Sequence, residues 1–282
     1  MPFRISAVQL QSALYELNGN LSRAAAAIER AAGDGSRVVL LPELAASGYG
    51  LDPNGLARAS DPVDGVVLRA WSALAKRHDI FIAGGFCERE GDRLYNSVLL
   101  VGPDGLAGHY RKLHLFDREK TVFTPGDKGL PVYRLPFAQV GLCVCYDLRF
   151  VEVVRALALQ GADLILVPTA WVGGFDRADV DASGFIGQVS GVLVQANLNQ
   201  VFVACASQAG TAGGIRFLGS SLIVDPYGRP MAGPLGQTVE AIASSEIDAD
   251  DARTARARSD LIRPREDRRT DLYGVVVAGT TY

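Results

Sequence analysis

The sequence has few cysteines, almost no net charge and no visible export signal. Its 282 residues contain four cysteines, which are too few and too scattered for a disulfide framework. A net charge of -3 gives no general attraction to phosphate backbones or anionic lipids. The N-terminal segment also lacks the charged head and long apolar middle of a secretory signal. We therefore expect a cytoplasmic protein with reduced thiols, whose partner is a small molecule rather than nucleic acid or membrane.

The sequence also lacks an apolar run suited to crossing a membrane. Residues 182–215 carry no charge, but Gln and Asn side chains interrupt this stretch repeatedly between positions 188 and 200. A membrane span needs about 20 predominantly apolar residues in a row. The uncharged stretch is therefore expected to be buried in protein.

Short β-rich runs alternate with helical patterns along the chain. The run FRISAVQL is followed by the Ala-rich LSRAAAAIERAA, for which Asn20 is a plausible N-cap, and then by RVVLLPE. The same alternation continues through DIFIAGG, DLILVP and QVFVACAS, each preceded by a helical pattern. Apolar strands separated by helices predict an α/β layered fold.

Three segments of the first half reappear in the second half in the same order. GSRVVLLP at 35–42 matches GADLILVP at 161–168, and HDIFIA at 78–83 matches NQVFVA at 199–204. SVLLVGP at 97–103 likewise matches SSLIVDP at 220–226. The nearly constant spacing predicts a duplicated unit, with two similar sheets packed face to face in one domain of pseudo-twofold symmetry.

The C-terminal part differs in character from the rest of the chain. Residues 248–273 are dense in charges of both signs, a pattern typical of a solvated helix and arm. We therefore expect a main domain at residues 1–260 and an arm at residues 261–282. The short apolar end of the arm, GVVVAG, is expected to dock on the body or on a second subunit.

Three reactive side chains stand at the ends of predicted strands, where layered α/β folds collect their ligands. Glu43 ends VVLLPE, Lys112 ends LAGHYRK and Cys145 ends QVGLCVC. A carboxylate can take the proton of a thiol that attacks a carbonyl carbon. An ammonium and a backbone N–H at a helix start can stabilise the oxyanion that develops. If the three converge, they are sufficient for acyl transfer.

The residues alone leave a structural interpretation open. A carboxylate or lysine at a strand end is commonly a solvated surface group, and a cysteine in an apolar strand commonly fills the core. We assign Cys87 and Cys205 to the core. Strand alternation places Cys143 on the same face as Cys145, and packing is its expected role.

Other kinds of site find little support in the sequence. Cys143 and Cys145 could ligate a metal, but no second cysteine pair and no His-x-x-x-His follows them. His78, His109 and His114 are isolated, so a Cys–His protease has no local signature. No glycine-rich phosphate loop follows a strand. We therefore expect neither a metal nor a cofactor.

Three longer motifs resemble the nitrilase superfamily of carbon–nitrogen hydrolases. They are LLPELAASGY at 40–49, HYRKLHLFDRE at 109–119 and GLCVCYDLRFVE at 141–152, and the likeness covers nearly the whole chain in the family's order. The resemblance implies a four-layer αββα sandwich, in agreement with the duplicated halves. It also implies a homodimer or a higher homo-oligomer, with an interface formed by two helices expected at 151–160 and 183–197.

The resemblance implies a role for seven residues of this chain. They are Cys145 as nucleophile, Glu43 as general base, Lys112 as oxyanion-stabilising cation, Glu119 as the carboxylate that orients the lysine, the N–H of Tyr146 as second oxyanion donor, and Trp171 and Tyr49 as substrate contacts. The sequence departs from the family pattern after Arg149-Phe150, where Val151 stands in place of the usual proline. Proline there would preset the first helical turn, so its absence is expected to change only the rim.

The implied activity is hydrolysis of a small amide, giving a carboxylic acid and ammonia through a cysteine thioester. An N-carbamoyl amidohydrolase is the nearest alternative; a nitrilase fits less well, because those members are typically longer and carry Trp-Glu where this chain has Tyr146-Asp147. Arg149, Arg177 and Arg216 are candidates for binding a substrate carboxylate.

Two interpretations without catalysis also remain. A protein that keeps the fold for binding alone is expected to lack a member of the triad, and none is missing. A thiol sensor could use Cys143 and Cys145, but a disulfide between positions i and i+2 of an extended strand has poor geometry.

Overall fold

Two six-stranded sheets form the centre of the molecule. The computed structural model describes residues 1–175 and 180–282. The first sheet has the order β14 (Ala241–Ile247), β1 (Phe3–Gln9), β2 (Ser36–Leu40), β3 (Phe81–Glu90), β4 (Arg93–Gly102), β5 (Gly105–Arg111). The second has the order β13 (Pro230–Ala232), β12 (Leu222–Val224), β9 (Phe202–Ser207), β8 (Leu164–Thr169), β7 (Gln139–Leu142), β6 (Val132–Arg134).

The two sheets repeat one topology, which confirms the internal duplication. In the first, β1, β2 and β3 are parallel and are flanked by the antiparallel strands β14, β4 and β5. In the second, β7, β8 and β9 are parallel and are flanked by the antiparallel strands β6, β12 and β13. Each strand of the first sheet thus has a counterpart at the same place in the second.

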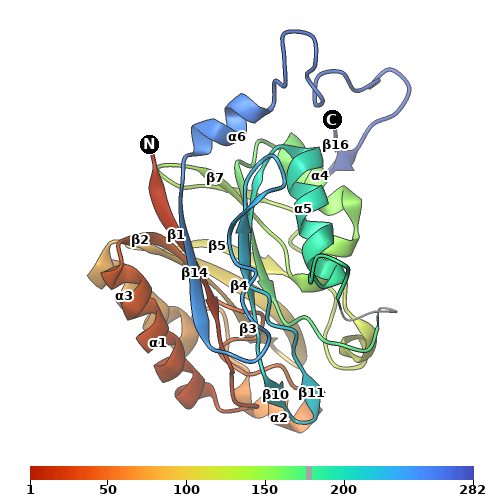
Figure 1. Ribbon diagram of the computed structural model, residues 1–282. Coiled ribbons are helices and arrows are strands. Elements are labelled where there is room, and N and C mark those ends of the chain that lie inside the picture. Colours follow the sequence, from red (N-terminus) through yellow and green to blue (C-terminus); the bar gives the residue numbers. More distant parts are fainter. Residues whose placement is uncertain (176–179) are drawn as a thin grey trace.

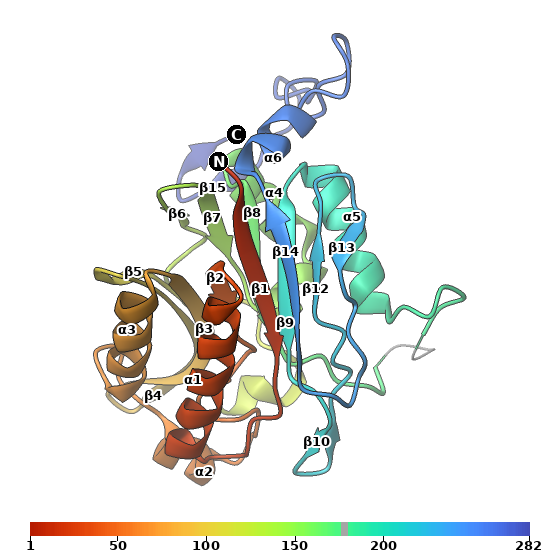
Figure 2. The same cartoon turned by 60° about the vertical axis from the view of Figure 1, so that its left-hand side comes forward.

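Helices cover the outer face of each sheet and complete four layers. The covering helices are α1 (Leu17–Gly33) and α3 (Val66–His78) on the first sheet, and α4 (Val151–Leu159) and α5 (Gly187–Asn199) on the second. Figures 1 and 2 show the two pairs on opposite sides of the paired sheets. The fold is the expected αββα sandwich.

Alternating side chains of each strand fill two different apolar layers. In β2, Val38 and Leu40 contribute to the core between the sheets, where side chains of both halves meet. Val39 and the following Leu41 point the other way and pack beneath α1 and α3. This period of two explains why the parallel strands are apolar on both faces, since each face is covered.

Shorter elements lie at the edges and carry the site and the arm. They are α2 (Pro53–Ala59), α6 (Ala249–Ala255), the single-turn 3-10 helices η1 (Asp117–Thr121) and η2 (Cys145–Arg149), and the hairpins β10 (Thr211–Ala212) with β11 (Ile215–Arg216) and β15 (Val276–Val277) with β16 (Thr280–Thr281). β7 ends at Leu142, so Cys145 begins η2 and does not end the strand as expected.

The expected cap of the first helix is wrong. α1 begins at Leu17, so Asn20 lies inside the helix and is buried. Its side-chain amide accepts from the N–H of Ala13 and donates to the carbonyl oxygens of Ala13 and Ala46. Asn20 therefore ties two loops to the helix, because a buried amide finds its partners in neighbouring backbone.

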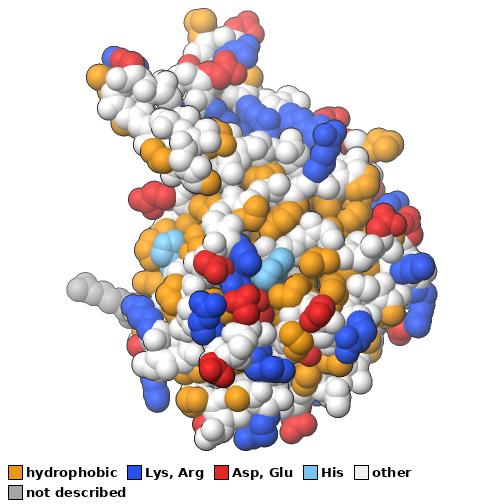
Figure 3. All heavy atoms as spheres, turned by 180° about the vertical axis from the view of Figure 1, so that it is seen from behind, with side chains coloured by type: hydrophobic (Ala, Val, Ile, Leu, Met, Phe, Trp, Pro, Cys, Tyr) orange, Lys and Arg blue, Asp and Glu red, His pale blue; other side chains and the backbone are white. Residues whose placement is uncertain are grey.

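The C-terminal segment leaves the body after α6 and returns along it. Figure 3 shows this arm standing out from the body. The guanidinium of Arg265 donates to the carbonyl oxygens of Ala158, Asn199 and Gln200, which lie at the C-terminal ends of α4 and α5. A cation at carbonyls left free by helix ends is favourable, so Arg265 anchors the arm.

Over the described residues, no helix is long and apolar enough to span a membrane.

Candidate active site

Three charged side chains meet in the buried space between the sheets. Glu43 follows β2, Lys112 follows β5 and Glu119 lies in η1. Lys112 Nζ lies 2.6 Å from Glu43 Oε1 and 2.8 Å from Glu119 Oε1. All three side chains are inaccessible to solvent. Burial of charges is costly unless they are paired, and here one ammonium binds two carboxylates.

Glu119 has a partner for each carboxylate oxygen. Its Oε1 accepts from Lys112 and from the hydroxyl of Tyr49, the latter at 2.6 Å. Its Oε2 accepts from the backbone N–H of Phe116 at 3.0 Å. A carboxylate held in this way is suited to orienting the lysine rather than to exchanging protons.

Glu43 is bound on one side only. Its Oε1 accepts from Lys112 and from the side-chain amide of Asn96, the latter at 2.7 Å. Its Oε2 is buried and accepts no hydrogen bond from any described residue. Such a buried orphan oxygen is uncommon and costs stability. It is therefore the carboxylate oxygen available to take a proton from a reactant.

The nucleophile candidate lies on a strained turn fixed by a buried aspartate. Cys145 has a φ of 45°, which is unfavourable for a residue other than glycine. Asp147 accepts from the N–H of Val144 at 2.9 Å and from the hydroxyl of Tyr110 at 2.7 Å. It also accepts from the N–H and Nδ1 of His114 at 3.0 and 2.8 Å. The turn that carries Cys145 is thus joined to the segment that follows Lys112.

The electrostatics of the site favour a protonated thiol near a buried carboxylate. Burial and the charge of Glu43 raise the pKa of Cys145, although Lys112 and a backbone hydrogen bond from Ala170 oppose the shift. Burial also raises the pKa of Glu43, with Lys112 opposing and Glu119 adding to the rise. Burial lowers the pKa of Lys112, but the two carboxylates outweigh it and the pKa is raised overall. These shifts favour the neutral form of the thiol, and a neutral thiol needs a base before it can attack a carbonyl carbon.

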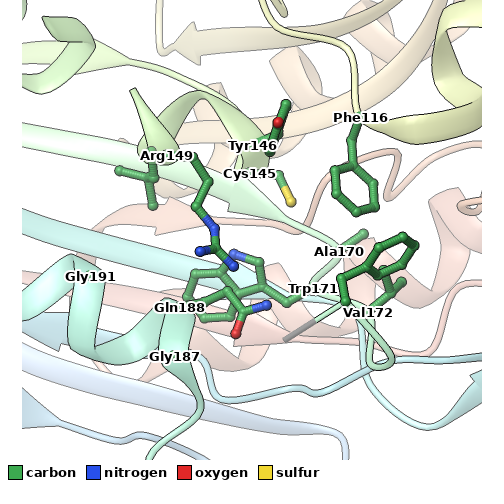
Figure 4. A pocket seen from close by; sticks show the side chains of 12 residues that line it. Phe116, Cys145, Tyr146, Arg149, Ala170, Trp171, Val172, Gly187, Gln188 and Gly191 are labelled. Carbon is green, nitrogen blue, oxygen red and sulfur yellow. The ribbon is translucent and has the colours of Figure 1, made fainter. Parts of the chain in front are cut away.

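A cavity of about 90 Å³ opens at Cys145. Figure 4 shows the sulfur pointing into it, with Phe116 on one side and the guanidinium of Arg149 on the other. The walls are mostly apolar and aromatic, and the polar groups come chiefly from Arg149 and Gln188. The other lining residues are Tyr146, Leu148, Ala170, Trp171, Val172, Phe175, Gly187 and Gly191. Tyr146 and Trp171, both expected at the site, therefore line the cavity.

A second, larger cavity of about 870 Å³ lies next to the first. Tyr49 lines this outer cavity and not the one that holds Cys145, while its hydroxyl is bound to Glu119. Arg216 also lines the outer cavity. Arg177, the third arginine considered for a substrate carboxylate, lies outside the described residues.

The remaining cysteines are buried away from the cavity, and all four thiols are free. Cys87 and Cys205 are inaccessible and pack in apolar clusters, as expected. Cys143 packs in the layer between the second sheet and its helices, and it does not line the cavity. Among the described residues no cluster of His, Cys, Asp or Glu is arranged to hold a metal ion.

Three contacts of the site were not anticipated from the sequence. Asn96 binds Glu43, Asp147 holds the turn at Cys145, and Phe116 binds Glu119 through its backbone while lining the cavity. A polar Asn in the apolar strand RLYNSVLLVG was a usable signal, because such a residue needs a partner. The other two depend on tertiary contacts and had no local signal.

Comparisons with known proteins show the family of the chain. The model of the carbon–nitrogen hydrolase family matches residues 4–257. The chain belongs to this family. Among relatives of this hydrolase, a nitrilase from Pyrococcus abyssi is 34% identical over 273 residues, covering 96% of this chain and 98% of the relative. An (R)-stereoselective amidase from a Pseudomonas species is 32% identical, covering 96% and 93%. The human omega-amidase is 33% identical, covering 97% of each chain.

Solved structures of an amidase from Nesterenkonia sp. AN1 share the fold of this hydrolase. One of them has a TM-score of 0.76 and 27% identity, with 96% of this chain and 98% of that chain covered. That structure shows acrylamide added at the active-site cysteine of the amidase. Another, of a cysteine-to-alanine variant, holds butyramide. The nitrilase superfamily and its four-layer fold, expected from the sequence, are thus confirmed for this chain.

Proposed function

We propose that this carbon–nitrogen hydrolase cleaves small amides, with Cys145 as nucleophile, Glu43 as general base and Lys112 as the cation that stabilises the oxyanion. The observation that carries the proposal is the buried Oε2 of Glu43, which accepts no hydrogen bond from any described residue. The charge of the same carboxylate raises the pKa of the Cys145 thiol, so the two groups interact. A base is needed at that place, and a free carboxylate oxygen supplies one.

The first half of the cycle forms a thioester. Glu43 takes the thiol proton as the sulfur of Cys145 bonds to the amide carbon, and the carbonyl oxygen becomes an oxyanion. Lys112 and the N–H of Tyr146 stabilise this oxyanion. When the C–N bond breaks, protonated Glu43 gives its proton to the departing nitrogen, which leaves as ammonia. Glu119 keeps Lys112 oriented throughout, because both of its oxygens are already engaged.

The second half repeats this sequence with water as the nucleophile. Glu43 removes a proton from a water molecule as the water oxygen attacks the thioester carbon. The C–S bond breaks, the carboxylic acid leaves, and the sulfur of Cys145 regains a proton from Glu43. One carboxylate therefore serves as base and acid twice in each turnover, which suits a group whose pKa is raised by burial.

The residues that line the inner cavity at Cys145 indicate which acyl groups fit the enzyme. Apolar and aromatic walls favour an aliphatic or aromatic acyl chain. Arg149 and Gln188 face the same space, which favours as a second candidate an acyl chain that ends in a carboxylate, as in the ω-amide of a dicarboxylic acid. N-carbamoyl compounds and nitriles are the competing classes.

The test is an ammonia-release assay over aliphatic amides, ω-amides, N-carbamoyl amino acids and nitriles. We expect turnover of amides by the native enzyme, complete loss in Cys145→Ala and retention in the matched Cys143→Ala. Mass spectrometry of a trapped acyl adduct then identifies the modified cysteine. Turnover that persists without the Cys145 thiol, or an adduct on Cys143, would refute the assignment.

The same proposal includes a homodimer located in the cytoplasm, with a body at residues 1–260 and an arm at residues 261–282. Large apolar side chains are exposed on the two outer helices, with Val151 on α4 and Val194 and Leu198 on α5 each more than half exposed. Apolar surface of this kind favours association. Sizing in solution tests the dimer: Val194→Asp with Leu198→Asp is expected to give monomers, and a native monomer contradicts it.

A further inference from the structure

A wall of three side chains separates the two cavities at the site. Phe116, Val172 and Phe175 line both the inner cavity at Cys145 and the outer cavity. The ring of Phe116 stands at the centre of an aromatic cluster. Its centroid lies 4.7 Å from that of Phe175 and 5.1 Å from that of Tyr146, both in edge-to-face arrangements. The two cavities therefore adjoin at these three side chains, two of which belong to an aromatic cluster.

We propose that Phe116 sets the upper limit on the length of the acyl group, so that the enzyme selects amides with short acyl chains. The proposal rests on the proposed function, in which the acyl group becomes attached to Cys145 and occupies the inner cavity. That cavity has a volume of about 90 Å³, whereas the space beyond the wall has about 870 Å³. A longer chain would have to occupy the position of the Phe116 ring.

Phe116 is the less exposed of the two aromatic side chains in this wall. Its backbone N–H donates to Glu119 Oε2, and its ring is held between Tyr146 and Phe175. Phe175 is 57% exposed and follows Gly173 and Gly174, so its own position is less constrained by packing. A size limit requires a side chain that resists displacement, and Phe116, which is less exposed than Phe175 and has two aromatic neighbours, is the better candidate of the two.

The contact between Phe116 and Glu119 also makes the proposal testable without loss of the chemistry. The hydrogen bond to Glu119 comes from the backbone, so Phe116→Ala retains it while removing the ring. The ring has no polar atom, so its removal deletes none of the hydrogen bonds that Lys112 makes with Glu43 and Glu119. Truncation should therefore join the two cavities and leave the catalytic groups in place.

The experiment compares kcat/KM for propionamide, hexanamide and N-butylpropionamide in the native enzyme, Phe116→Ala and Phe116→Leu. Ile215→Ala is the matched control, because Ile215 lines only the outer cavity. We expect the ratio of hexanamide to propionamide to rise at least tenfold in Phe116→Ala, since methylenes that fit a pocket contribute 10-fold or more to discrimination. Phe116→Leu should give a smaller rise and remains informative if the alanine variant does not fold.

The ratio of hexanamide to propionamide turnover in the variants decides the proposal. A raised ratio in Phe116→Ala, with Ile215→Ala unchanged, supports the proposal. An unchanged ratio with propionamide turnover retained overturns it, as does an equal rise in Ile215→Ala. A gain confined to N-butylpropionamide also overturns it, because the wall would then face the leaving amine. If the native enzyme hydrolyses no amide at all, the proposed function itself has failed.

Discussion

The hydroxyl of Tyr49 lies 2.6 Å from Glu119 Oε1, the same oxygen that accepts from Lys112 at 2.8 Å. Burial and the charge of Glu119 raise the pKa of Tyr49, so its hydroxyl stays protonated and always donates. Two donors at one oxygen hold the carboxylate against rotation and keep its charge directed at the lysine. Tyr49, which the resemblance places among substrate contacts, thus acts on the position of Lys112 through Glu119.

We expect Tyr49→Phe to lower kcat about tenfold with little change in KM, because a hydrogen bond to a charged group contributes roughly 1.5 to 3 kcal/mol and the ring is kept. Steady-state kinetics with the amide that the native enzyme hydrolyses fastest give kcat and KM separately. Tyr95→Phe is the matched control: Tyr95 is also buried, but its hydroxyl makes only a 3.5 Å contact with Glu90. A change in KM alone would assign Tyr49 to substrate binding instead.

The two carboxylates at Lys112 should respond differently to amide substitution. Glu43→Gln removes the base and is expected to lower kcat by a factor of about 10² to 10⁴. Glu119→Gln should leave a weaker enzyme that still has a base, because Glu43 keeps its free Oε2. Equal losses with the same residual pH dependence in both variants would contradict this division of roles.

The pH dependence of kcat/KM should also distinguish the roles of Glu43 and Glu119. The base must be ionised, so activity should fall as the pH drops through the raised pKa of Glu43. Glu119 adds to that rise, so Glu119→Gln should move the acid limb to lower pH. In Glu43→Gln the acid limb should be absent from the residual activity. Profiles from pH 4 to 9 measure both effects, and an acid limb moved upward in Glu119→Gln would count against the model of the site.

The sequence was sufficient to predict the layers of the fold and two of the three candidate residues that follow strands, Glu43 and Lys112. Strands that are apolar on both faces can be recognised from a short stretch of sequence, and so can their repetition in the second half of the chain. The positions of Glu43 and Lys112 were predictable for a related reason. Two antiparallel pairings make β5 run in the same direction as β2, so the carboxyl ends of both strands lie at one edge of the sheet. Glu119 was anticipated only through the resemblance, since no periodicity marks it.

Contacts between distant segments could not be predicted in this way. Tyr49 and Glu119 are 70 residues apart, and their hydrogen bond depends on how two loops approach each other. Asn20 was expected to cap a helix from its residue type, but the tertiary contacts with Ala13 and Ala46 determine its place. The end of β7 before Cys145 was missed because an apolar run does not reveal a change to positive φ.

Asp147 is predicted to be a positioning residue for Cys145. Asp147→Asn should destabilise the protein by about 2 kcal/mol and also lower kcat at least tenfold, because it weakens the bonds that hold the turn. Asp163→Asn is the matched control: Asp163 is also buried but binds Arg253 and Arg256 away from the cavity. It should lose comparable stability while kcat stays unchanged. Urea unfolding and kinetics together decide, and equal kinetic losses in both variants would reduce Asp147 to a purely structural role.

Stability in acid should depend on a second buried network, on the outer face of the first sheet. Glu88 accepts from Ser97, His109 and Arg111. Burial alone would raise its pKa, but these hydrogen bonds outweigh it and lower the pKa from 4.5 to about 2. A carboxyl whose pKa is lowered by folding stabilises the protein above its unfolded value and loses that contribution as the pH falls.

We therefore expect the free energy of unfolding to decrease by roughly 2 kcal/mol between about pH 4.5 and pH 2 on account of Glu88. This is less than the full shift implies, because solvent screens the network on its exposed side. Glu88→Gln should be less stable than the native protein at pH 7 and should lack this part of the acid dependence. Urea unfolding at a series of pH values measures it, with Glu246→Gln, an exposed site on β14, as control. An acid dependence that is the same in Glu88→Gln as in the native protein would mean that other carboxylates carry it.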